Sequence, residues 1–170
     1  MAGETITKRI VDLCKDLPAR RIVEIGSLNI NGEIRQEFPQ AFSYLGIDIV
    51  PGPGVDIVAD GSIWLPELPA DLVLCSGVLE HTAKAEAIVR NAYRMLRPGG
   101  TAVILTTCRM RPHSAVTGEY LTPPYREYYR NVQGHELLNW MGDFQEAMVW
   151  RERRYLFGVG KRLDKRIDFS

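Results

Sequence analysis

A glycine turn and a single carboxylate stand about two dozen residues apart, each at the end of an apolar run. Glu24-Ile25-Gly26-Ser27 closes the first run, and Asp48 follows the next one. Glycine lets the backbone approach a ligand closely, and a carboxylate can accept hydrogen bonds from both hydroxyls of a ribose. The pair predicts a nucleoside-binding sheet, although a tight turn followed by a solvated acid would give the same pattern.

Two common phosphate-binding motifs do not fit this turn. The segment from Gly26 to Gly32 lacks the second glycine of a dinucleotide fingerprint. Gly32 follows five spacers and precedes Glu33, which excludes a P-loop. A ligand without phosphates therefore fits better than a nicotinamide dinucleotide, and an oxidoreductase is disfavoured.

The elements that must position these residues alternate between strands and helices. Apolar spacing and turn residues predict helices over 6–17 (ended by Pro18), 34–38 (behind a cap at Asn31), 82–96 (capped by Thr82) and 135–141. Buried runs predict strands over 21–25, 42–47, 55–59, 71–75, 101–106, 144–150 and 155–159. Arg97-Pro98-Gly99-Gly100 reads as a turn, and residues 107–133 as an ordered functional loop.

This order implies an open, mostly parallel α/β sheet with helices on both faces and a terminal antiparallel pair. Ligands of such sheets bind beyond the carboxyl ends of the strands. Those ends carry Gly26-Ser27, Asp48, Asp60-Gly61 and Ser76-Gly77. For Asp60 alone, a helix cap or a turn acid is the simpler interpretation.

The strand-end segments, taken in order, resemble the successive motifs of class I S-adenosylmethionine-dependent methyltransferases of the small-molecule type. The resemblance covers residues 21 to about 106 and rests on these segments: Val23-Glu24-Ile25-Gly26-Ser27, Tyr44-Leu45-Gly46-Ile47-Asp48, Val58-Ala59-Asp60-Gly61, Asp71 to Ser76 with Leu79-Glu80-His81, and Arg94 to Gly100. It implies a three-layer Rossmann-like fold with a mostly parallel seven-stranded sheet.

By matching position, the resemblance also implies a role for each motif residue. Glu24, Gly26 and Ser27 would line the methionine part of S-adenosylmethionine, Asp48 would hold the ribose, Asp60 with Gly61 would meet the adenine, and Ser76 would lie near the sulfonium. Ile49 is also predicted to contact the cofactor. Leu28 and Ile30 stand where the family usually has further glycines, so the course of this loop departs from the family pattern.

Methyl transfer needs alignment more than reactive side chains, because the cofactor supplies the electrophile. An acceptor hydroxyl or amine must lose a proton, for which His81 is the first candidate base and His113 the second. Glu80-His81 could equally be a capped helix start with a surface histidine.

The 107–133 loop follows the fifth strand at the cofactor edge and should cover the substrate. Arg109, Arg111, Tyr125 and Tyr128 in it suggest an anionic or aromatic small acceptor, since arginine binds anions and tyrosine offers a flat apolar face. Solvated arginines with tyrosines packing the loop down would explain the same composition.

Composition limits the remaining classes. The 170 residues fit one domain over 1–170, with a cofactor half (1–106), a substrate loop (107–133) and a C-terminal helix and strand pair (134–170). With 21 basic and 21 acidic residues the chain has no net field toward nucleic acid, and Thr122-Pro123-Pro124-Tyr125 follows the wrong strand for a nucleic-acid amino-methylation motif. A nucleic-acid methyltransferase is therefore disfavoured, although the basic residues of 151–166 could contact RNA or DNA.

The cysteines and the hydropathy give the remaining expectations. Three widely spaced cysteines predict reduced core thiols, no metal site and a cytoplasmic setting, and no apolar run is long enough for a membrane span. A non-catalytic methyltransferase-like partner subunit stays open, as does the oligomeric state.

Overall fold

In the computed structural model, residues 2–30 and 34–163 are described; the predicted cap at Asn31 lies outside them. Across these residues, seven strands form one sheet in the order β3-β2-β1-β4-β5-β7-β6. Their bounds are β1 Arg21–Ile25, β2 Ser43–Asp48, β3 Ile57–Val58, β4 Ala70–Ser76, β5 Leu96–Thr107, β6 Gln145–Glu152 and β7 Tyr155–Lys161. β1 to β5 run parallel, and β7 pairs antiparallel with both β5 and β6. The predicted α/β fold with its antiparallel C-terminal pair is confirmed.

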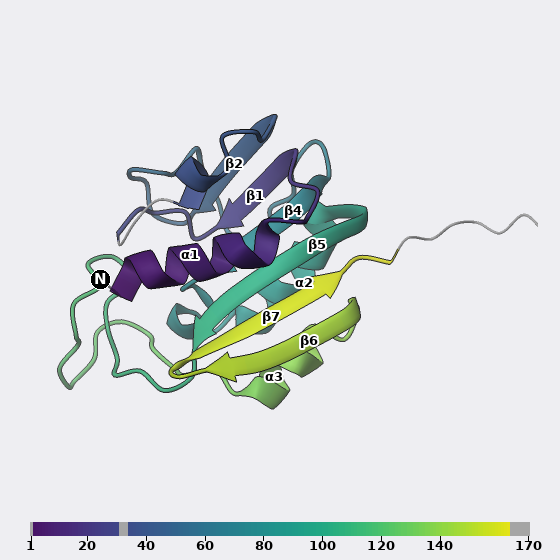
Figure 1. The fold of residues 1–170 in the computed structure, drawn as a ribbon. Coiled ribbons are helices and arrows are strands. Elements are labelled where there is room, and N and C mark those ends of the chain that lie inside the picture. The colour runs from purple at the N-terminus through teal and green to yellow at the C-terminus, as the bar shows by residue number, and fades with distance from the viewer. Residues whose placement is uncertain (1, 31–33, 164–170) are drawn as a thin grey trace, which may run out of the picture.

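Helices cover both faces of the sheet (Figure 1). Helix α1 (Ala2–Cys14) and the 3₁₀ helix η1 (Ile34–Glu37) pack on one face, and α2 (Ala85–Met95) and α3 (Gly134–Trp140) on the other. A second 3₁₀ helix, η2 (Leu79–His81), follows β4. None of the helices in the described part of the chain is long and apolar enough to cross a membrane.

The strands alternate between two hydrophobic cores because successive side chains point to opposite faces. In β4, Leu72 and Leu74 pack toward α1, whereas Val73 and Cys75 pack toward α2. The same alternation holds in β1 and β5, so all three central strands are buried on both sides. Burial on both faces fixes the register of these strands, and thereby the height at which each strand ends.

Three local predictions were wrong. The segment Arg97–Gly100 is not a turn but a bulged start of β5: the pairing jumps from Ala70–Leu96 to Leu72–Thr101, and Gly99 takes a positive φ of 77°. Thr82 does not cap α2, which begins after Lys84; its Oγ1 instead accepts a hydrogen bond from the Lys84 amide. The third strand, predicted over 55–59, is only two residues long. Asp56, just before it, is instead bonded to Gly46 through both its amide and its side chain: its amide donates to the Gly46 carbonyl, and its carboxylate accepts a hydrogen bond from the Gly46 amide.

Candidate active site

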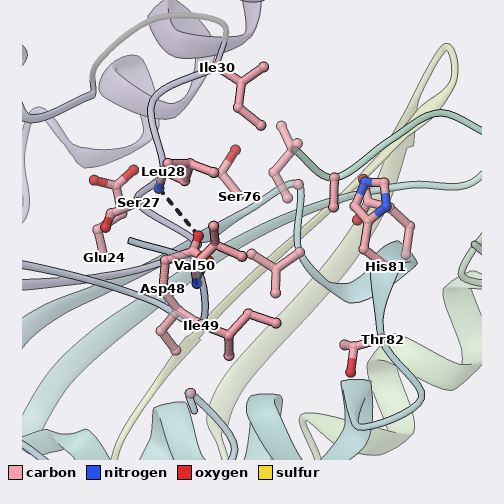
Figure 2. A pocket seen from close by; sticks show the side chains of 18 of the residues that line it. Glu24, Ser27, Leu28, Ile30, Asp48, Ile49, Val50, Ser76, His81 and Thr82 are labelled. Atoms are coloured by element: carbon pink, nitrogen blue, oxygen red, sulfur yellow. Dashed lines mark hydrogen bonds between the residues drawn. The ribbon is translucent and has the colours of Figure 1, made fainter. Parts of the chain in front are cut away.

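A pocket of about 600 Å³ lies at the carboxyl ends of β1, β2 and β4. This is where the strand order reverses direction, between β1 and β4, as expected for ligand sites of open parallel sheets. All eight residues predicted for the cofactor line it: Glu24, Gly26, Ser27, Asp48, Ile49, Asp60, Gly61 and Ser76. Figure 2 shows Glu24, Ser27 and Asp48 on one side of this pocket and His81 on the opposite side.

Gly26 makes the turn out of β1 that opens the pocket. Its φ is 80°, and a Cβ built at this position would lie only 2.0 Å from Cγ2 of Val78. Its amide donates to the Ile47 carbonyl at 2.9 Å, so the turn stays attached to β2 beyond the end of the ladder. Glycine is required here both for the backbone angle and for the close approach of the β4–η2 segment.

Asp48 is held at the end of β2 by the two loops that flank it. Its Oδ2 accepts a hydrogen bond from the Leu28 amide at 3.3 Å, and its Oδ1 accepts one from the Val50 amide at 3.0 Å (Figure 2). Each carboxylate oxygen keeps a further lone pair. The side chain is therefore fixed in direction yet can still accept hydrogen bonds from two ligand hydroxyls.

Asp60 lies at the start of a turn that follows β3. Its Oδ1 accepts hydrogen bonds from the amide and the hydroxyl of Ser62 at 2.9 and 2.6 Å, and the Lys84 ammonium donates to Oδ2 at 2.7 Å. The Lys84 bond, followed by those from Ser62, lowers the pKa of Asp60 to about 2. The carboxylate is thus charged at any ordinary pH and accepts hydrogen bonds only.

Asn91 in α2 holds this turn in place, and sequence reasoning did not find it. Its side-chain amide is 1% exposed and donates to the carbonyls of Gly61 and Trp64 at 3.0 and 2.7 Å. An asparagine on the otherwise apolar face of α2 was the available signal, because a buried amide needs polar partners. Asn91 therefore positions Asp60 and Gly61 without touching the pocket.

The other strand-end side chains fill the space between these anchors. Glu24 is buried and accepts a hydrogen bond from the Tyr44 hydroxyl at 2.8 Å. Ile49 is 71% exposed at the rim, where it offers an apolar face to a ligand. Ser76 ends β4 near the middle of the pocket (Figure 2).

Two histidines, His81 and His113, lie together at the far end of the pocket. Their rings are 4.9 Å apart and edge-on, and the Tyr129 ring lies 5.4 Å from His81 and 5.0 Å from His113. The Tyr129 hydroxyl is 2.8 Å from Oγ1 of Thr107, which ties this aromatic cluster to the end of β5. Both histidines were predicted from the sequence as site residues, but Tyr129, whose ring contacts both of them, was not.

The environment of His81 disfavours its charged form. Burial, reinforced by the neighbouring His113, lowers the pKa of His81 to about 4. Glu80 is 1% exposed, and burial raises the pKa of its carboxyl, although Thr106 donates a hydrogen bond to it at 2.7 Å. The alternative of a surface histidine is therefore not what the structure has: His81 is a half-buried, neutral imidazole beside a buried carboxyl.

The four residues predicted to bind substrate are not among those that line the pocket. Arg109 is exposed, Arg111 stacks 4.9 Å over the Tyr120 ring, and Tyr125 and Tyr128 are about half exposed. The loop instead presents mostly small and apolar side chains to the pocket. The Asn131 side chain bonds the Met110 backbone in both directions, and the arginines on either side of Met110 are exposed. The lining residues from 107–133 are Thr107, Met110, His113, Ser114, Ala115, Val116, Gly118 and Tyr120.

Comparison with known proteins agrees with this geometry. Residues 7–149 match the profile of a family described as a methyltransferase domain. A search of curated protein sequences gives no match.

Many solved structures share the fold. Burkholderia thailandensis 1,6-didemethyltoxoflavin-N1-methyltransferase, solved with its substrate and S-adenosylhomocysteine, is 17% identical, with a TM-score of 0.66 over 96% of this chain and 79% of that one. The N-methyltransferase NodS of Bradyrhizobium japonicum, in complex with S-adenosylhomocysteine, is 12% identical (TM-score 0.65, 94% and 86%). An S-adenosylmethionine-dependent methyltransferase of Clostridium acetobutylicum is 8% identical (TM-score 0.67, 92% and 90%). At such identities the likeness concerns the fold.

Proposed function

The chain belongs to the methyltransferase-domain family, and from this membership we propose that it transfers the methyl group of S-adenosylmethionine to a small, neutral, aromatic or apolar acceptor. The observation that carries the cofactor assignment is the gathering of Gly26, Asp48 and Asp60 around one pocket. They come from three different strand ends, and each offers what one part of this cofactor needs.

The cofactor would lie along the strand ends with its adenosine toward β2 and β3. Asp48 would accept hydrogen bonds from the two ribose hydroxyls. The Asp60 carboxylate, which can only accept hydrogen bonds, would face the adenine amino group. Within residues 2–30 and 34–163, the arginine and lysine side chains that line the pocket are Arg35 and Lys84, which are already paired with Asp56 and Asp60. The described part of the lining therefore keeps no unpaired arginine or lysine for a phosphate, which favours a sulfonium nucleoside over a nucleotide.

When bound, S-adenosylmethionine supplies an electrophilic methyl carbon on a positively charged sulfur. An acceptor atom aligned with the carbon–sulfur bond would take the methyl group while the bonding pair stays with sulfur. The products would be S-adenosylhomocysteine, the methylated acceptor and one proton released from the acceptor atom. The protein's task is to align the two reactants, which can account for about 7–11 kcal/mol of the barrier. We place the sulfonium beside Ser76 and the acceptor atom toward His81 and His113, the groups that can polarise it or take up its proton.

The acceptor end of the pocket favours a neutral molecule over an anion. Beyond the strand-end residues, the pocket lining includes Ile6, Met110, Val116, Tyr120 and Tyr155, whereas it does not include Arg109 or Arg111. Burying a carboxylate against such walls without a partner would cost several kcal/mol. A flat neutral ring would instead gain aromatic contacts and apolar burial.

A methyl-transfer screen with labelled S-adenosylmethionine tests the proposal. Neutral phenols and heteroaromatics are compared with carboxylates, phosphate esters and nucleic acid, each with the wild-type protein and with Asp48→Ala. We expect transfer to neutral rings that is lost in Asp48→Ala, and no dependence on Arg109→Ala. If the wild-type protein binds neither S-adenosylmethionine nor S-adenosylhomocysteine by calorimetry, the proposed function is wrong.

A further inference from the structure

Glu80, His81 and His113 gather three metal-ligand side chains in one corner of the pocket. One ligand atom from each can be chosen so that all three lie within 4.8 Å of one another. We propose that these residues bind a divalent transition-metal ion at the acceptor end of the pocket. The site is additional to the cofactor residues at the strand ends; the role given to the ion below rests on the proposed function.

The spacing of the ligand atoms needs only a small contraction. Three points separated by at most 4.8 Å fit in a circle of radius 4.8/√3, so some point lies within about 2.8 Å of all three. Bonds from Zn²⁺ to imidazole nitrogen and carboxylate oxygen are about 2.0–2.2 Å long. Shifts of roughly 0.7 Å, within reach of small rotations about side-chain bonds, would bring the three groups to bonding distance.

The hydrogen bonds around the corner already orient two of the ligands. Nδ1 of His113 lies 3.1 Å from the Arg111 carbonyl, which can only accept, so this nitrogen carries the proton and Nε2 keeps a free lone pair. The Thr106 hydroxyl donates to Oε2 of Glu80 at 2.7 Å. Imidazole bonded to a backbone carbonyl, and a carboxylate bonded to a hydroxyl, are the outer contacts that metal ligands usually have.

Within the described part of the chain, His81 has a nitrogen without a hydrogen-bond partner and Glu80 has no counter-charge, and a cation would satisfy both. Nδ1 of His81 is buried and makes no hydrogen bond. The Glu80 side chain is fully buried, and no ion pair involves it among the described residues. A buried nitrogen without a partner and a buried carboxylate without a counter-charge are both costly, and one cation would satisfy both.

Two imidazoles and one carboxylate favour a borderline transition metal over Mg²⁺ or Ca²⁺, which prefer oxygen ligands alone. Three protein ligands would leave at least one coordination position open. Because all three residues line the pocket, that position would face the space assigned to the acceptor. The ion would supply Lewis acidity to the acceptor heteroatom and lower its pKa, so that its proton could pass to water, and His81 and His113 would then be ligands instead of free bases.

Titration of tag-free protein with Co²⁺, followed by visible absorption and calorimetry, tests the site. We expect one equivalent to bind, Zn²⁺ to displace it, and excess Mg²⁺ to leave it in place. His81→Ala and His113→Ala should each weaken binding by at least about tenfold, since even changes to outer contacts of metal sites cost 10–100-fold. His135→Ala is the matched control and should bind as the wild type does, because the only other histidine of the chain is exposed on α3.

Folding is checked in each variant by binding of S-adenosylhomocysteine, which uses Asp48 at the other end of the pocket. Should a histidine variant lose that binding as well, Glu80→Gln replaces it as the test, because it keeps the size of the side chain. The inference is overturned if the wild type binds no stoichiometric Co²⁺, or if binding is unaffected in His81→Ala and His113→Ala. If the wild-type protein binds Co²⁺ as expected but transfers no methyl group, the proposed function is contradicted and the metal site is not.

Discussion

Replacing Asp48 by alanine should weaken the binding of S-adenosylhomocysteine by two to four orders of magnitude. The Asp48 carboxylate lies at the end of β2 with a lone pair left on each oxygen, beyond the bonds from the Leu28 and Val50 amides. We expect these lone pairs to accept hydrogen bonds from the two ribose hydroxyls. Hydrogen bonds to a charged group are worth about 1.5–3 kcal/mol each, so losing two costs about 3–6 kcal/mol. At about 1.4 kcal/mol per tenfold, this is roughly a 10²–10⁴-fold loss of affinity.

The effect on folding should be much smaller than the effect on binding. The amides that Asp48 holds lie in a half-exposed loop, so water can replace the lost acceptor, and we expect a cost near 1 kcal/mol. Isothermal calorimetry gives the dissociation constant, and thermal unfolding without ligand gives the stability. The two measurements separate a missing ribose contact from a general loosening of the fold.

Asp71→Asn is the matched control for Asp48→Ala. Asp71 is a carboxylate at the opposite end of the sheet, where it accepts hydrogen bonds from the Arg21 amide at 2.7 Å and the Arg97 guanidinium at 2.5 Å. Its replacement should lower the melting temperature and leave the affinity of the folded protein unchanged. If Asp48→Ala binds S-adenosylhomocysteine within about threefold of the wild type, the ribose assignment is refuted.

Three further predictions follow from the cofactor end of the pocket. Gly26→Ala should weaken cofactor binding and lower stability by at least about 1–2 kcal/mol, the cost of a left-handed angle, and adding Val78→Ala should recover the part due to the 2.0 Å contact; additive effects in a double-mutant cycle would contradict this. Asn91→Leu should destabilise the protein by about 2–4 kcal/mol in denaturant unfolding, since it leaves two carbonyls without donors; a loss below 1 kcal/mol would mean that the turn relaxes freely. Because Lys84 and Ser62 lower the pKa of Asp60 from 3.8 to about 2, its contribution to stability is complete above pH 4 and lost as the pH falls toward 2, so unfolding curves of Asp60→Asn should show less acid dependence in that window than those of the wild type.

The cofactor end could be predicted from the sequence because the sheet determines it. Buried apolar runs identify β1, β2 and β4, and in a parallel sheet the residue after each run must lie at the same edge. Gly26 and Asp48 follow from that rule alone, without knowledge of any contact between them. What the rule does not include is the support behind the edge, so Asn91, which bonds across from α2, was missed.

The bulge in β5 could not be predicted from the local sequence, because contacts with distant residues determine it. Proline and two glycines in a row normally make a turn, yet here the Gly100 carbonyl accepts the Arg162 amide at 2.8 Å and the Arg97 side chain binds Asp71. Both partners are distant in sequence. Residues with high turn propensity are therefore held in an extended course by tertiary contacts.

The acceptor end differs because its direction is set by side chains of the loop itself. Asn131 bonds the Met110 backbone, and Tyr129 reaches Thr107, so the loop folds back with His113 inward and its arginines outward. Arginine and tyrosine content could not show which face of an irregular loop would turn inward, since no period relates one residue to the next. The contact between His81, after β4, and His113, in the loop, likewise depends on tertiary structure and could not be predicted from the sequence pattern.

This division has a consequence for how specificity can change. Substitutions in the 110–120 segment would alter the walls proposed for the acceptor without changing the strands that carry the proposed cofactor residues. By contrast, Glu80 and His81 follow directly on β4 and are bound to the β5 end through Thr106. Of the groups that would act on the reacting atom, Glu80 and His81 are thus built on the rigid sheet and His113 on the loop, which also carries the side chains that would select the acceptor. Changes of acceptor by loop variation should leave the chemistry at Glu80, His81 and His113 in place only while His113 Nδ1 keeps donating its hydrogen bond to the Arg111 carbonyl.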